Sequence, residues 1–218
     1  MAFSTTARRA GIASTILVVL FELLYAITLA IGLSGLESPD QPIGDPIFTI
    51  MEALILIVAP LMVVVMIALH AWTDKALHVP SIAAIVFMSL CALVTSVVHF
   101  AILTISRTAA FAGQPSHSLF FSFTWPSVAY SLDILAWDVF FAISVLCAAG
   151  CLRGEGWERW PRRLLILSGV LALAGLAGVA TGNMQLRNIG IVGYVPVFAI
   201  ACGSLAVLFS RTPASRVG

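Results

Sequence analysis

Four carboxylates lie within stretches that are otherwise apolar enough to cross a membrane: Glu22, Glu52, Asp133 and Asp138. An ionisable side chain in hydrocarbon costs about 2.5–3.5 kcal/mol on insertion scales, so such groups usually face a packed interior, a cavity or a water path. A carboxylic acid kept neutral by apolar surroundings can protonate an olefin or an epoxide, and a second carboxylate can take up the proton. We therefore interpret Asp133 as a candidate catalytic acid, with Glu22 or Asp138 as its counterpart.

Other polar and aromatic side chains occur at similar predicted depths. Aromatic faces stabilise developing positive charge, and arginine or histidine can pair with an acid or hold a polar group. The candidate substrate-binding residues are Glu52, His99, Arg107, Trp125, Tyr130, Trp137 and Arg187. Asp133 and Asp138 are five positions apart, so in a straight α-helix they point about 140° away from each other. We expect each of them to meet a different neighbour.

Several cofactor and catalytic classes are disfavoured by the residues present. Retinal requires a Schiff-base lysine within the bundle, whereas the only lysine, Lys75, falls in a predicted loop. A bis-histidine haem needs histidines at matching depth, but His70 and His99 are predicted at opposite sides of the membrane. The chain has no GxSxG elbow, HExxH helix or P-loop. We predict neither a cofactor nor a metal site.

The elements that carry these residues follow from composition. The 218 residues are 61% hydrophobic and only 10% charged, whereas a soluble domain is about 25% charged. A helix needs about 20 apolar residues to cross the hydrocarbon core. We predict a single integral membrane domain over 1–218, an all-α polytopic bundle of about six spans. The predicted spans are 11–33, 46–71, 80–105, 120–152, 163–181 and 189–209.

The basic residues predict the orientation of the bundle. If the N-terminus is inside, nine basic residues face the cytoplasm and only Arg107 and Arg187 lie outside, in agreement with the positive-inside rule. The nine are Arg8, Arg9, Lys75, Arg153, Arg159, Arg162, Arg163, Arg211 and Arg216. We therefore expect a multi-pass protein of the cell membrane with both termini cytoplasmic. Most of the unusual polarity then falls in the outer half.

These features leave three functions open. The first is a membrane-embedded enzyme, an isomerase or cyclase acting on a lipophilic or isoprenoid substrate. The second is a proton-coupled small-molecule transporter or channel, because graded carboxylates and a histidine also suit a proton relay. The third is a non-catalytic ligand-binding subunit or sensor. The one-sided polarity favours an outward pocket over a conduit.

The expected partners are membrane lipids and a lipophilic small molecule, and no nucleic acid. Small residues recur every four positions in the last two predicted spans, which allows helices to approach closely. The two stripes are Ala174, Gly178 and Gly182, and Ala199 and Gly203. Packing of these two helices against each other is the first interpretation, and a homodimer through the glycine-rich helices is the alternative.

Overall fold

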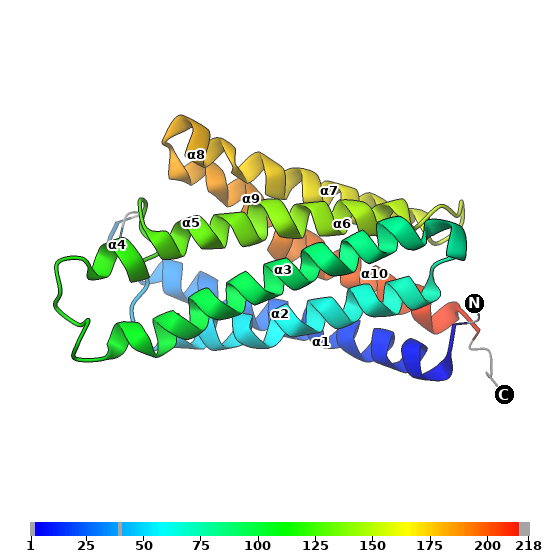
Figure 1. The fold of residues 1–218 in the computed structure, drawn as a ribbon, viewed down its shortest axis with the longest axis horizontal. Helices are drawn as coiled ribbons and strands as arrows, with labels where there is room; N and C mark the ends of the chain where they lie inside the picture. The colour runs from blue at the N-terminus through cyan, green and yellow to red at the C-terminus, as the bar shows by residue number, and fades with distance from the viewer. Residues whose placement is uncertain (1–2, 39–40, 214–218) are drawn as a thin grey trace.

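The computed structural model describes residues 3–38 and 41–213. Among these residues it contains helices and loops and no strands, and six of its helices are long and apolar enough to cross a membrane (Figure 1). The prediction of an all-α polytopic bundle is confirmed to this extent. The chain has the architecture of a multi-pass integral membrane protein.

The first three spans are nearly continuous helices. They are α1 (Thr5–Ser34), α2 (Ile47–Trp72) and α3 (His78–Leu103), and short 3₁₀ turns extend the third span to Lys75–Arg107. Ser4 caps α1, since its hydroxyl accepts a hydrogen bond from the Ala7 amide. Their lengths match the roughly 20 residues needed for a crossing.

The last three spans are built from shorter pieces. The fourth, Val128–Gly150, consists of α5 (Val128–Ile134), a π-helix (Leu135–Phe141) and α6 (Ala142–Gly150). The fifth consists of α7 (Arg159–Gly175) and α8 (Ala177–Thr181). The sixth runs through a 3₁₀ turn (Met184–Arg187), α9 (Asn188–Val192), a second π-helix (Gly193–Val197) and α10 (Phe198–Arg211).

Two of the boundaries that differ from the sequence prediction affect the candidate site residues. The predicted fourth span, 120–152, is divided: α4 (His117–Phe121) is a separate short helix, and Ser127 caps the start of α5 by accepting from the Tyr130 amide. The sixth span begins at Met184 instead of residue 189. Arg187 therefore lies inside this span and not in the preceding loop.

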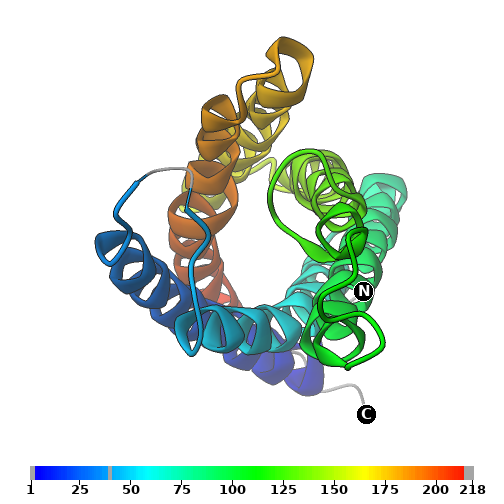
Figure 2. The same cartoon turned by 90° about the vertical axis from the view of Figure 1, so that its left-hand side faces the viewer.

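The two ends of the bundle differ. The described residues begin and end at one end of the bundle, the terminal end, which contains the start of α1, the end of α2 and the end of α10 (Figure 1). The opposite end, the loop end, contains the end of α1, the start of α2 and α4. Seen from the loop end, α1, α2, α3, α5 and the last span surround a common interior (Figure 2). Buried aromatic and methionine side chains fill the core, among them Phe141, Phe198, Phe209, Met62 and Met88.

Candidate functional site

Five charged side chains form a connected row near the loop end, which we call the charged row. His99 Nδ1 lies 2.7 Å from Glu52 Oε2, and His99 Nε2 lies 3.4 Å from Asp133 Oδ1. Arg187 donates from Nη2 to Asp133 Oδ2 at 2.7 Å and from Nε to Asp138 Oδ2 at 3.1 Å. None of the five residues is more than 8% exposed. The row connects α2, α3, the fourth span and the sixth span.

The row runs across the bundle and not along it. Glu52 lies five residues after the start of α2, and His99 lies four residues before the end of α3. Asp133 lies five residues after the start of α5. At a rise of 1.5 Å per residue these positions are all about 6–8 Å from the loop end of their helices. Only Asp138, five residues further along, lies deeper.

A π-helix explains how Asp133 and Asp138 meet the same arginine. The expectation that each acid meets a different neighbour is wrong, because it assumed a straight α-helix. The π-helix Leu135–Phe141 begins two residues after Asp133 and contains Asp138. Its i→i+5 hydrogen bonds widen the turn, which brings residues five apart towards one face. Both carboxylates thereby reach Arg187.

Glycines make room for the buried Asp138 carboxylate. Its Oδ1 atom has no hydrogen-bond partner among the described residues. A Cβ atom at Gly190 would lie 2.7 Å from this oxygen, and one at Gly175 would lie 3.1 Å from it. A Cβ at Gly178 would lie 3.1 Å from the Arg187 amide nitrogen. Gly175 and Gly178 of the fifth span and Gly190 of the sixth therefore pack within the chain against Asp138 or Arg187.

Aromatic rings cover the charged row. The Phe123 ring stacks on His99, with 5.3 Å between centroids. The Arg187 guanidinium lies over the Tyr130 ring, 4.6 Å from its centroid. Trp137 packs on Tyr194, with centroids 5.1 Å apart. Tyr194 was absent from the candidates because a lone tyrosine in an apolar helix gives no signal of its own.

Two of the candidate binding residues lie at the periphery. Arg107 is at the loop-end rim, where its Nη2 donates to Thr49 Oγ1 at 2.7 Å and lies 3.4 Å from Asp45 Oδ1. Hydrogen bonds from Thr49 and the charge of Arg107 lower the pKa of Asp45. Trp125 contacts the Tyr130 ring and is 37% exposed. Neither Arg107 nor Trp125 contacts the charged row directly.

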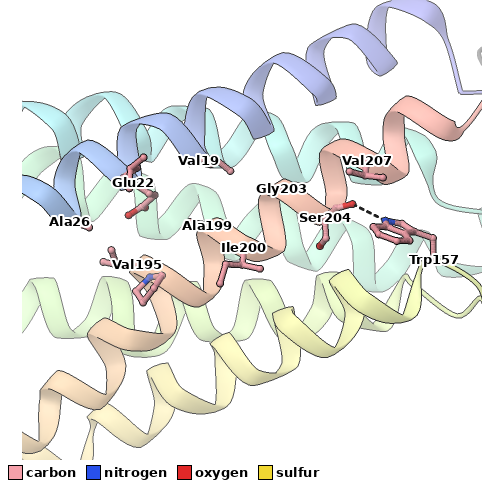
Figure 3. Close-up of a pocket in the computed structure, with 12 residues that line it drawn as sticks. Val19, Glu22, Ala26, Trp157, Val195, Ala199, Ile200, Gly203, Ser204 and Val207 are labelled. Atoms are coloured by element: carbon pink, nitrogen blue, oxygen red, sulfur yellow. Dashed lines mark hydrogen bonds between the residues drawn. The ribbon is translucent and has the colours of Figure 1, made fainter.

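Glu22 lies in a different environment, a groove between α1 and α10. The side chain is 4% exposed and forms no hydrogen bond with any residue that the structure describes. The groove has a volume of about 580 Å³ and almost entirely apolar walls (Figure 3). Leu23 and Ile200 on its edges are 56% and 60% exposed, so it opens on the outer surface of the bundle. We call it the Glu22 groove.

Tyr25 lies one turn after Glu22 on α1. Its hydroxyl forms no hydrogen bond with another described residue. The structure thus brings Glu52, His99, Asp133, Asp138 and Arg187 together and leaves Glu22 apart.

Comparison with known proteins gives no match. No protein-family model matches the chain, and neither a curated protein nor a solved structure matches it. Among the described residues, no group of three or more His, Cys, Asp or Glu side chains is arranged to hold a metal ion. The charged row and the Glu22 groove are therefore the features that indicate a function.

Proposed function

We propose that this chain is a membrane-embedded enzyme that performs acid–base chemistry of the isomerase or cyclase type on a lipophilic substrate. The observation that carries the proposal is the Glu22 carboxyl group, which is buried, unpaired and exposed only to an apolar groove. An unpaired charge in such surroundings costs several kcal/mol, so the carboxyl is protonated at rest. It is then a proton donor placed where a lipid chain can reach it.

The proton donor in this proposal is Glu22, whereas the sequence favoured Asp133. Arg187 donates to Asp133 at 2.7 Å, and such a charge-assisted bond favours the ionised carboxylate. An ionised group cannot give up a proton. Asp133 instead belongs with His99 and Glu52 as a proton acceptor, and Asp138 neutralises Arg187 from its other side.

The chemistry needs no oxidant or reductant. The Glu22 hydroxyl transfers its proton to one carbon of a C=C bond, and the electron pair of that π bond forms the new C–H bond. The neighbouring carbon becomes a cation. Loss of a proton from the next carbon to the Glu22 carboxylate forms a shifted double bond and restores the acid. Attack by a second double bond of the same substrate would close a ring instead and move the cation to a carbon of that second bond. Loss of a proton from the neighbouring carbon to the Glu22 carboxylate would then form a new double bond and restore the acid.

The orientation in the membrane is part of the proposal. The terminal end contains the start of α1, the end of α10 and the loop between α6 and α7, where the arginines are concentrated. Under the positive-inside rule this end faces the cytoplasm. The loop end with the charged row then faces the opposite side of the cell membrane.

Proton-coupled transport is the second candidate, because His99 lies between two carboxylates as in a proton relay. The transverse direction of the charged row argues against it, since a relay must run along the bundle. A non-catalytic ligand-binding role would use the Glu22 groove without proton transfer.

Solvent deuterium uptake tests the proposal without knowledge of the substrate. The protein, purified in mild detergent with its native lipids, is incubated in D₂O, and the extracted lipids are analysed by mass spectrometry. Reversible protonation on carbon adds deuterium that survives extraction into H₂O. We expect uptake with the wild type and its loss in Glu22→Gln. The matched control is Glu37→Gln, because Glu37 is exposed.

Three other outcomes would redirect the proposal. Equal uptake in wild type and Glu22→Gln would show that Glu22 is not the donor. Absence of uptake, together with proton flux into proteoliposomes that His99→Gln abolishes, would establish the transport alternative. Absence of both would favour the ligand-binding role.

A further inference from the structure

We infer that the Glu22 groove holds one hydrocarbon chain lengthwise, with the polar head of the substrate at the terminal-end interface and a distant chain carbon at Glu22. This inference rests on the proposed function and narrows its substrate to linear, single-chain amphiphiles such as isoprenoids with a polar head. Chemistry would then occur far from the head group, in the middle of the membrane.

The length of the groove matches one leaflet. Its wall on the last span is a stripe of residues four apart, Val195, Ala199, Gly203 and Val207. Val195 and Val207 are twelve positions apart, which corresponds to about 18 Å along a helix. Half of the hydrocarbon core is about 15 Å. A chain lying in the groove would therefore extend from the membrane surface to near the bilayer midplane.

Small residues produce the hollow. A Cβ atom at Gly203 would meet only the Val19 side chain, at 4.0 Å, so α1 does not fill the space above it. Ala199 continues the hollow one turn further along. Ala199 and Gly203 thus line an open part of the Glu22 groove, and the buried carboxyl of Glu22 faces this groove (Figure 3).

The two ends of the groove have different chemistry. At the terminal end Trp157 lines it, held by a 3.3 Å hydrogen bond from its Nε1 to the Ser204 carbonyl and by the Arg211 guanidinium 4.7 Å from its ring centroid. Tryptophan and arginine are typical of the head-group level of a membrane. Towards the other end the Glu22 carboxyl is the polar group (Figure 3). This polarity fixes the direction of the chain.

Photolabelling tests the direction. Two single-chain fatty-acid probes, one with a diazirine next to the head and one with it at the methyl end, are incubated with the full chain in nanodiscs. Peptide mapping by mass spectrometry locates the labels. We expect the methyl-end probe to label Glu22 and its neighbours on α1, and the head-end probe to label the Trp157 and Val207 region. The reverse pattern, or labels scattered over the whole bundle, would overturn the inference.

Two variants separate the groove from the chemistry. Gly203→Leu fills the Glu22 groove and should reduce labelling by both probes about tenfold, which is equivalent to about 1.4 kcal/mol of binding free energy. Glu22→Gln should keep labelling on α10 although deuterium uptake is lost. If both probes label the groove but the wild type shows no deuterium uptake, the groove would stand as a binding site for a lipid chain and the enzymatic function would be rejected. Disulfide dimers of Ala199→Cys that exclude both probes would show a second copy of the chain in the groove and overturn the lipid assignment.

Discussion

Asp133 and Glu22 are both buried carboxyl groups in apolar helices, but their neighbours differ. Asp133 accepts a hydrogen bond from Arg187 and faces His99, whereas Glu22 has no hydrogen-bond partner among the described residues and lines an apolar groove. Removing one partner of a buried ion pair lowers the free energy of unfolding strongly, because the other charge is left buried and unpaired. Removing a lone buried acid leaves no charge unpaired, so the free energy of unfolding changes little. Burial alone therefore does not separate a structural acid from a reactive one, while pairing does.

The largest expected effect comes from removing the shared cation of the charged row. Arg187→Met leaves Asp138 buried without a counter-ion and leaves Asp133 with His99 alone, so we expect a loss of about 3–5 kcal/mol in the free energy of unfolding. Unfolding by SDS titration in mixed micelles measures it. Arg107→Met is the control, because the exposed pair with Asp45 should contribute about 1 kcal/mol or less. Equal losses would mean that the charged row is not the structural centre.

A smaller loss of stability is expected at Gly190, which makes room for Asp138 of the charged row. Gly190→Ala places a Cβ 2.7 Å from Asp138 Oδ1, which should cost about 1–3 kcal/mol through forced displacement. The control is Gly150→Ala at the end of α6, where a Cβ meets nothing within 4 Å. The same unfolding titration compares them. If Gly190→Ala were as stable as Gly150→Ala, the tight packing around Asp138 would be disproved.

A double-mutant cycle measures the interaction between Glu52 and His99, the α2 end of the charged row, separately from the rest of the row. We expect Glu52→Leu and His99→Leu together to cost less than the sum of the single changes, with a coupling of about 1.5–3 kcal/mol for a buried charge-assisted bond. The comparison cycle on Asp45 and Arg107 should give about 0.2–1 kcal/mol. A coupling near zero between Glu52 and His99 would separate Glu52 from the row.

The sequence was sufficient for the bundle and for the identity of the unusual residues. Apolar stretches of about 20 residues predict spans because a crossing requires that length. Glu22, Glu52, Asp133 and Asp138 were noticeable because acids are rare in such stretches. Tyr130 was also among the candidate residues, and it does lie under the arginine that holds Asp133.

The partners of these residues could not be predicted in the same way. Helical phase fails at a π-helix, which no pattern in Leu135–Phe141 announces, so Asp133 and Asp138 were separated. Arg187 was placed in a loop because a charged residue ends an apolar run, although the last span begins before it. The small residues Ala199 and Gly203 are compatible with tight helix packing or with an open groove. Which of the two occurs depends on the position of α1, which the sequence pattern does not give.

The smallest change in stability is expected at Glu22, together with the clearest loss of chemistry. Glu22→Leu removes a polar group that has no described partner, so we expect no loss of stability and a gain of up to about 1 kcal/mol. Asp133→Leu, the matched change in the charged row, should lose several kcal/mol because it breaks a buried pair. Both are measured by SDS titration, and deuterium uptake by the bound lipids is followed in parallel. A stable Glu22→Leu protein without uptake would identify Glu22 as a group retained for chemistry. If Glu22→Leu unfolded as easily as Asp133→Leu, Glu22 would be a structural acid, and the distinction between the groove and the charged row would fail.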